Sequence, residues 1–230
     1  MVSPNVAIII AMTLVLFFSI YESKGASYSS ASHIDGADEI TPFAHQKVNL
    51  SVYYESLCQP CAVFIIKNLE EIFNNDLINI VNLRLVPWVN AYVNMTNNSI
   101  SCQNGPDECK LNSLETCSLN IWPDVNIQYA LIYCFEFLVI EGRNKKWHNC
   151  FDELDLLEEP ILDCLDTGNG TELGKRYINE ISQLYPPPSF VPWVVVNNEP
   201  IGEDYENFAY YVCKAYRGVA APAACNLRMK

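Results

Sequence analysis

The fold is decided by one stretch of the chain, Val48-Asn49-Leu50-Ser51-Val52-Tyr53-Tyr54-Glu55-Ser56-Leu57-Cys58-Gln59-Pro60-Cys61. Its first half, Val48–Tyr54, is rich in β-branched and aromatic residues and predicts a β-strand. After Cys61, apolar residues recur with a helical period from Ala62 to Phe73, which predicts an amphipathic helix. Proline suits the first helical turn because its missing N–H costs nothing there. The two cysteines are therefore expected at the N-terminus of a helix that follows a strand.

Two thiols three positions apart at a helix start suit thiol–disulfide exchange. The unpaired N–H groups and the helix dipole favour a thiolate on Cys58, the expected nucleophile. Cys61, further inside the helix, is the expected resolving cysteine. Two simpler interpretations stay open, a structural disulfide and one half of a zinc site.

The rest of the sequence argues against zinc and predicts no metal or other cofactor. It contains no second C-x-x-C pair, and His33, His45 and His148 are scattered singly. Solvated loop positions are the expected places for these histidines.

The N-terminus predicts export. Val6 to Ile20 is an almost unbroken apolar run, shorter than the roughly 20 residues of a bilayer span. Ser23 and Gly25 fit the positions before a cleavage site, so residues 1–25 are predicted to be a signal peptide. A retained membrane anchor is the alternative. No other apolar stretch is long enough to span a membrane, so no membrane association is expected after cleavage.

Composition predicts one domain with its own core. Residues 26–46 are rich in Ser, Ala, Gly and Asp and predict a flexible lead-in or propeptide, followed by a domain over 47–225 and a tail over 226–230. Half of the residues are hydrophobic, which suits a core that needs no metal. The net charge of −13 argues against nucleic acid and anionic membranes as partners.

Export also makes the remaining cysteines and the sequons informative. An even number of further cysteines in an oxidising compartment predicts as many as four structural disulfides, with their pairing left open. Sequons in polar, turn-like stretches predict N-glycosylation at Asn94, Asn97 and Asn169, while the sequon at Asn49 falls inside a predicted strand, which argues against its use. The cysteines predicted to form these structural disulfides are Cys102, Cys109, Cys117, Cys134, Cys150, Cys164, Cys213 and Cys225.

The order of predicted elements indicates an α/β fold. A second strand is expected over 78–86, helices over 123–140, 152–164 and 171–185, a strand over 190–196 with a hairpin at Asn197-Asn198, and a last helix over 205–216. This β-α-β, helical segment, β-β-α order resembles a thioredoxin-like fold with a cysteine-rich, largely helical insertion at about 90–185.

Val191-Pro192 opens the late strand, a position that a proline tolerates. The resemblance to thioredoxin-like proteins implies a cis peptide bond there, facing the C-x-x-C pair. It also implies that Val191 and Pro192 offer backbone groups to an extended substrate segment. A trans proline that simply opens the strand is the alternative.

A more specific string follows at Cys102-Gln103-Asn104-Gly105-Pro106-Asp107-Glu108-Cys109-Lys110-Leu111-Asn112 and ends at Cys117. It resembles the C-Q-H-G-x-x-E-C-x-x-N-x-x-x-x-C signature of the gamma-interferon-inducible lysosomal thiol reductases. Asn104 stands where that family has a histidine. The segments 53–58 and 191–197 are also similar to this family, and the resemblance covers about 47–225.

The resemblance implies an enzyme that reduces protein disulfides, often in acidic endolysosomal compartments, with Cys58 and Cys61 as its catalytic pair. Its partners would be disulfide-containing protein substrates and a small-thiol or protein electron donor. The signature cysteines look structural, with a second redox pair as their alternative role. An exported oxidase or isomerase and a non-catalytic, disulfide-stabilised binding glycoprotein stay open, as do extracellular, lysosomal and vacuolar destinations.

Overall fold

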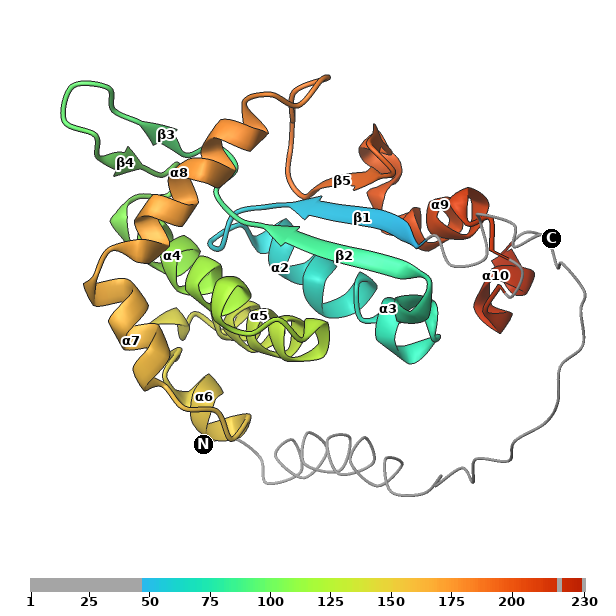
Figure 1. Cartoon of the computed structure of the whole chain (residues 1–230), viewed down its shortest axis with the longest axis horizontal. Coiled ribbons are helices and arrows are strands. Elements are labelled where there is room, and N and C mark those ends of the chain that lie inside the picture. The colour runs from blue at the N-terminus through green and yellow to red at the C-terminus, as the bar shows by residue number, and fades with distance from the viewer. Residues whose placement is uncertain (1–46, 219–220, 229–230) are drawn as a thin grey trace, which may run out of the picture. The chain divides into compact units, whose positions relative to one another are not determined.

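The computed structural model describes residues 47–218 and 221–228 (Figure 1). The predicted signal peptide (1–25), the lead-in (26–46) and the last two residues of the predicted tail lie outside these ranges. No helix within the described ranges combines the length and the apolar character needed to cross a bilayer.

A four-stranded sheet in the order β2-β1-β5-β6 carries the fold. β1 (Val48–Tyr53) and β2 (Val81–Val86) are parallel, as a β-α-β unit requires. β5 (Trp193–Val196) runs antiparallel to β1, and β6 (Glu199–Pro200) runs antiparallel to β5. The second strand begins three residues later than predicted, because η2 (Leu77–Asn79) is a 3₁₀ turn.

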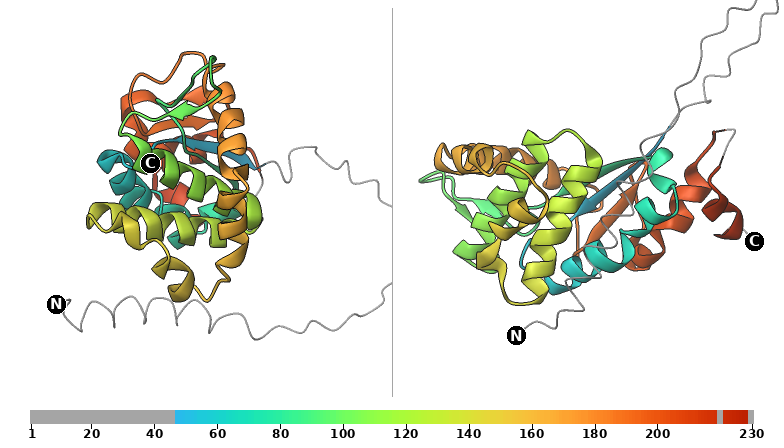
Figure 2. Two further views of the ribbon diagram at one scale, coloured as in Figure 1. Left: turned by 90° about the vertical axis from the view of Figure 1, so that its left-hand side faces the viewer. Right: turned by 90° about the horizontal axis from the view of Figure 1, so that it is seen from below.

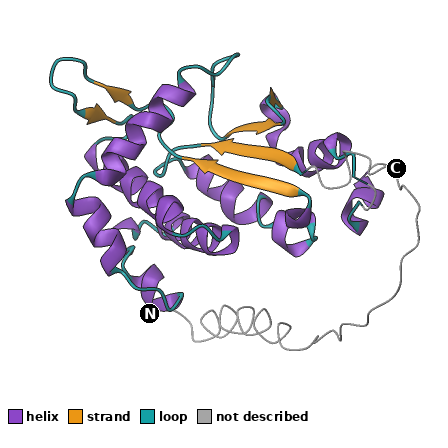
Figure 3. Cartoon of the chain, viewed as in Figure 1, coloured by secondary structure: helices purple, strands orange, loops and turns teal. Residues whose placement is uncertain are grey.

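The two faces of this sheet contact different apolar clusters. Val48, Leu50 and Val52 alternate along β1 into the main core, and Tyr53 belongs to a smaller cluster on the other face. Helices lie on both sides of the orange strands in Figure 3. The apolar and aromatic residues that predicted this strand are therefore buried on both faces of the sheet.

The helical stretch after the C-x-x-C pair is not one regular helix. α2 (Gln59–Val63) continues into a π-helical turn, η1 (Phe64–Asn68), and then into α3 (Glu71–Asn74). The N–H of Leu69 donates to the carbonyl of Phe64 at 2.9 Å, five residues back, which widens this turn. The predicted apolar face is buried all the same, at Ala62, Ile65, Leu69 and Ile72.

The insertion stands between β2 and β5, where the sequence predicted it. Its helices gather at one end of the sheet, away from the C-terminal helices (Figure 2). The predicted helix at 152–164 is two helices, because the chain turns between them at Asp155, whose φ is 53°. The elements are β3 (Tyr92–Val93), β4 (Ile100–Ser101), α4 (Pro106–Ile121), α5 (Val125–Ile140), η3 (Asn144–Lys146), α6 (Asn149–Glu153), α7 (Glu159–Asp166) and α8 (Asn169–Ile181).

Helix α4 is the longest of the described elements that the sequence analysis missed. It packs against α5, α7 and α8, so it lies in the middle of the insertion. Its buried face is largely polar and therefore lacks the apolar period that marks a helix. The buried polar residues are Glu108, Asn112, Ser113, Glu115, Thr116 and Ser118.

Two glycines let α8 approach its neighbours closely. A Cβ at Gly170 would lie 2.8 Å from the carbonyl oxygen of Ser113 and 2.9 Å from Sγ of Cys117. A Cβ at Gly174 would lie 2.5 Å from the indole ring of Trp88, which is itself buried. Side chains at these positions would push α8 away from α4.

The C-terminal part is more helical than predicted. η4 (Gly202–Asn207) and α9 (Phe208–Ala215) replace the single expected helix at 205–216. A further helix, α10 (Ala223–Arg228), follows and is joined to α9 by the Cys213–Cys225 disulfide. Helix α10 thus includes residues 226–228 of the predicted tail.

Candidate active site

Cys58 and Cys61 form a disulfide at the start of α2, so the structure holds the oxidised form of the pair. The S–S bond is 2.10 Å long and the Cα atoms are 5.2 Å apart. Cys58 is the N-cap residue, and its Sγ accepts a hydrogen bond from the N–H of Cys61 at 3.2 Å. Cys61 is fully buried, whereas Cys58 is partly exposed. Cys58 is therefore the more accessible of the two cysteines.

The Val191–Pro192 peptide bond is cis, as predicted. Pro192 is buried and directly precedes Trp193, which pairs with Tyr53 at the end of β1. The chain leaves β1 at that same end of the sheet and reaches Cys58 five residues later. The sheet therefore brings the proline and the cysteine pair to one end of the fold. A second cis bond, Tyr185–Pro186, was not predicted.

The other cysteines form four disulfides, the largest number that the sequence allowed. Among the described residues no cysteine is left unpaired. The signature cysteines do not pair only with one another, because Cys117 reaches α7. The pairs are Cys102–Cys109, Cys117–Cys164, Cys134–Cys150 and Cys213–Cys225.

The chain matches the model of a known protein family. The model described as "Gamma interferon inducible lysosomal thiol reductase (GILT)" matches residues 49–154. A gamma-interferon-responsive lysosomal thiol protein of Arabidopsis thaliana is 38% identical over 184 residues, which cover 78% of this chain and 76% of that protein. The chain belongs to the GILT family. A gamma-interferon-inducible lysosomal thiol reductase of Mus musculus is 31% identical over 183 residues, covering 78% of this chain and 72% of that protein.

Solved structures add evidence on the fold alone. Chlamydia trachomatis DsbA superposes with a TM-score of 0.53 at 15% identity, covering 81% of this chain and 96% of that one. BdbD from Bacillus subtilis, in its oxidised form, superposes with a TM-score of 0.53 at 14% identity, covering 77% of this chain and 91% of that one. The thioredoxin-like α/β fold with a helical insertion is confirmed. As a GILT-family member, the protein is an oxidoreductase of the thiol reductase class.

Two residues of the GILT signature bind the segment before Cys58. Ser56, two residues before Cys58, donates its N–H to Oδ1 of Asn112 at 3.1 Å and its hydroxyl to the carbonyl of Glu108 at 3.3 Å. Both acceptors belong to α4, so the segment that leads to the Cys58–Cys61 pair is docked on the helix that carries the signature. Sequence reasoning did not assign a role to these residues.

Asn104 occupies the position of the family's histidine and contacts two carboxyl groups. Its side-chain amide donates to Oε2 of Glu55 at 3.3 Å and to Oε2 of Glu108. Asn90 donates to the other carboxyl oxygen of Glu55. Burial, and then the charge of Glu108, raise the pKa of Glu55 to about 7, against the lowering effect of the Asn90 hydrogen bond. The spacing of Glu108 and Asn112 in the signature was the available signal, since residues four apart share one helix face.

A second polar cluster lies deeper, between β1 and the insertion. Tyr54, Glu115 on α4 and Glu136 on α5 are fully buried. Neither the Tyr54 hydroxyl nor the carboxyl oxygens of Glu115 and Glu136 make a hydrogen bond of ordinary geometry within the described residues. Burial raises the pKa of all three groups, and the charge of Glu115 raises that of Glu136 further.

The other predicted residues lie away from this site. Asn94, Asn97 and Asn169 are exposed, the first two in the β3–β4 connection, and their glycosylation stays a prediction. His148 is exposed and contacts Glu158, while His33 and His45 lie outside the described residues. Residues 47–218 and 221–228 contain no group of three or more side chains that would hold a metal ion.

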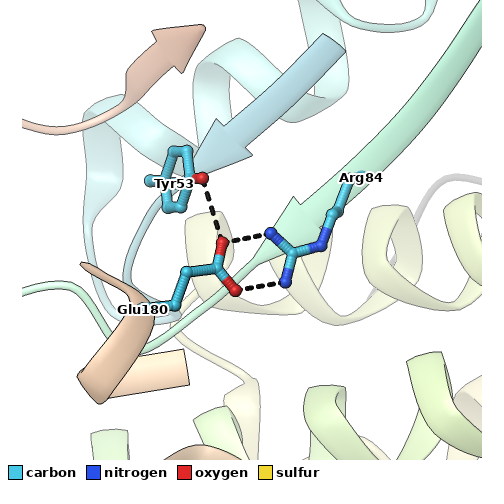
Figure 4. Close-up of polar contacts among 3 residues, drawn as sticks. All are labelled: Tyr53, Arg84 and Glu180. Atoms are coloured by element: carbon cyan, nitrogen blue, oxygen red, sulfur yellow. Dashed lines mark hydrogen bonds and ion pairs between the residues drawn. The ribbon is translucent and has the colours of Figure 1, made fainter. Parts of the chain in front are cut away.

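A polar groove of about 560 Å³ is hollowed against β1 and β2. Glu180 of α8 forms an ion pair with Arg84 of β2 and accepts a hydrogen bond from the hydroxyl of Tyr53 at 3.0 Å (Figure 4). In the described structure neither Cys58 nor Pro192 lines this groove. The contacts there hold α8 on the sheet rather than serving the cysteine pair.

Proposed function

We propose that this protein reduces disulfide bonds of protein substrates through Cys58 and Cys61, at acidic pH in an endolysosomal or vacuolar compartment. The observation that carries the proposal is the partly exposed Cys58 at the start of α2, bonded to a fully buried Cys61. Membership of the GILT family and the lysosomal names of its relatives support the compartment.

The reaction begins with both cysteines reduced. The Cys58 thiolate attacks one sulfur of a substrate disulfide, which forms a mixed disulfide and releases the other substrate sulfur as a thiol after protonation. The Cys61 thiolate then attacks Sγ of Cys58 and releases the second substrate thiol. Two electrons have passed to the substrate, and the enzyme is left with the Cys58–Cys61 disulfide. A small thiol or a protein dithiol must return two electrons before the next cycle.

Acidic operation requires a depressed thiol pKa. An ordinary thiol, with a pKa near 8.5, is only about 0.03% ionised at pH 5. No lysine, arginine or histidine neighbours Cys58 in sequence. The hydrogen bond from the Cys61 N–H to Sγ of Cys58 is the interaction that would stabilise a Cys58 thiolate in the reduced enzyme.

Val191 and Pro192 would position the substrate. They lie where β5 begins, at the end of the sheet from which the chain leaves β1 for Cys58. A residue just before a strand has backbone groups to offer to an extended peptide. The bound peptide would thereby present its disulfide to Cys58.

Insulin reduction tests the proposal. The wild type, preincubated with a small thiol, should reduce insulin disulfides faster at pH 5 than at pH 7.5, and Cys58→Ser should abolish turnover. Full activity of Cys58→Ser would contradict the assignment. Equilibration with a glutathione buffer separates a reductase from an oxidase or isomerase, because the reduction potential sets the net direction. A bridge that resists mild reduction would identify an inert binding glycoprotein instead.

A further inference from the structure

Four acidic side chains are buried between the Cys58 segment and the insertion. Glu108, Glu115 and Glu136 have no exposed surface, and Glu55 is 1% exposed. Acidic residues are almost never fully buried unless they are paired. None of the ion pairs found among the described residues includes any of these four. Their negative charge must be removed in another way.

Asn104 brings two of these carboxyls together, those of Glu55 and Glu108. The side-chain amide of Asn104 donates to both Glu55 and Glu108, and its backbone N–H donates to Oε1 of Glu108 at 3.4 Å. An amide supplies hydrogen bonds but no positive charge. Two ionised carboxylates meeting at one neutral amide would repel each other, because both side chains are buried. One proton on Glu55 removes this repulsion.

The groups that face this pair from the surrounding elements are also acids. Glu115 lies two helical turns after Glu108 on α4, and Glu136 faces Glu115 from α5. Tyr54 contributes from the end of β1, and Tyr177 of α8 acts on Tyr54. Each negative charge among these groups makes it harder for a neighbouring group to ionise. The raised pKa of Glu55 agrees with this arrangement.

The carboxyl pair is mechanically connected to the catalytic cysteine. Glu55 directly precedes Ser56, whose two hydrogen bonds dock the segment on α4. One of them ends on the carbonyl of Glu108, so repulsion between the Glu55 and Glu108 carboxylates acts on the contact that holds this segment. A second negative charge near Cys58 would also disfavour its thiolate.

We propose that Glu55 and Glu108 are positioning residues that, through Asn104, hold the Cys58 segment on α4 while Glu55 carries a proton, so that turnover falls when this proton is lost. The inference rests on the proposed reductase activity and gives its acid preference a cause in named residues. It concerns the binding of one proton from solution and changes no step of electron transfer.

The pH profile of insulin reduction between pH 4 and 9 tests the proposal. Glu55→Gln keeps the hydrogen-bonding shape but needs no proton, so its activity should persist at least one pH unit further into the alkaline range than that of the wild type. Asn104→His restores a titratable cation between the carboxyls and should shift the profile in the same direction. The matched control Asp107→Asn removes an exposed carboxyl beside Glu108 and should reproduce the wild-type profile. If the pH profile of Glu55→Gln has the same shape as that of the wild type, whatever its absolute activity, the proposal is overturned.

A second measurement does not depend on turnover. Carboxyl ¹³C NMR of the oxidised protein should show one glutamate that titrates near pH 7 and is absent from Glu55→Gln. Ordinary titration of Glu55 would overturn the proposal even in an active enzyme. Failure of the wild type to reduce insulin at any pH would instead contradict the proposed function, and the NMR titration would still decide whether Glu55 carries the proton.

Discussion

Asn112 of α4 accepts a hydrogen bond from the backbone N–H of Ser56, with 3.1 Å between the nitrogen and Oδ1. The two residues are 56 positions apart, and both are completely buried. This single contact joins the segment before Cys58 to the helix that carries the GILT signature. It explains physically why an asparagine belongs at that place in the string.

Replacing Asn112 with alanine should weaken both stability and activity. The Ser56 N–H would lose its acceptor while staying buried, which costs about 1–3 kcal/mol of unfolding free energy. We expect kcat/KM for insulin to fall by about tenfold, equivalent to about 1.4 kcal/mol. Asn120→Ala, at an exposed position of the same helix, serves as the control. Unchanged stability and activity in Asn112→Ala would show that the docking contact is dispensable.

Gly174→Ala should destabilise the protein although alanine is the better helix former. The added methyl would meet the ring of Trp88, whose Nε1 donates to the Thr116 hydroxyl at 2.7 Å and is held in place by it. Overpacking of this kind costs about 1–3 kcal/mol, more than the gain in helix propensity of about 1 kcal/mol. Chemical denaturation measures the difference. Asn179→Ala, exposed on the same helix, should be neutral or stabilising, and the same result for Gly174→Ala would contradict the close packing.

Stability should decrease as the pH rises from about 4.5 to about 8. Burial raises the pKa of Glu115 from 4.5 to about 8, so the folded state binds this proton more tightly than the unfolded state. The resulting stability is present below the unfolded pKa and is lost as the pH passes through the folded pKa. One pKa unit corresponds to about 1.4 kcal/mol, so the loss amounts to several kcal/mol.

Glu136→Gln should flatten this pH dependence. The amide removes one of the two buried ionisable groups and can donate a hydrogen bond to Glu115, so the variant should be more stable than the wild type at pH 8 and close to it at pH 5. Urea denaturation across this range gives the comparison, with Glu153→Gln, at an exposed position, as the control. If the unfolding free energies of Glu136→Gln and the wild type changed in parallel with pH, ionisation of the buried pair would not contribute to the pH dependence of stability.

Tyr53→Phe should have a small effect that is confined to stability. It removes one partly buried hydrogen bond to Glu180, worth about 1 kcal/mol. The Arg84–Glu180 ion pair remains, and neither Cys58 nor Cys61 lines the groove it occupies. Insulin reduction should therefore be unchanged after correction for the folded fraction. A large loss of turnover would connect the groove to catalysis.

Much of the fold could be predicted because its signals are local. The strand before Cys58, the helix start at the cysteines and the strand at 190–196 each depend on residues close in sequence. Helix α5 was also recognised, since its apolar residues dominate its length. The π-helical turn after α2 does not change which residues of this stretch are buried. The sequence therefore predicted the buried face correctly, although it predicted one regular α-helix.

The missed features depend on contacts between distant residues. α4 buries glutamates, an asparagine and hydroxyl residues, whose partners come from the Cys58 segment, Trp88 and α5. The arrangement of the Glu55 and Glu108 carboxyls depends on the contact between Glu55 and Asn104, which are 49 positions apart. Pairing of the eight further cysteines was undetermined for the same reason, since spacing alone permits many connectivities.

Trapping the mixed disulfide tests the central claim most directly. Reduced Cys61→Ser protein, mixed with insulin at pH 5, should accumulate a covalent adduct through Cys58 that dithiothreitol reverses, and Cys58→Ser should form none. Peptide mapping locates the bond. An adduct formed by Cys58→Ser, or one attached to any cysteine other than Cys58, would contradict the assignment of Cys58 as the nucleophile.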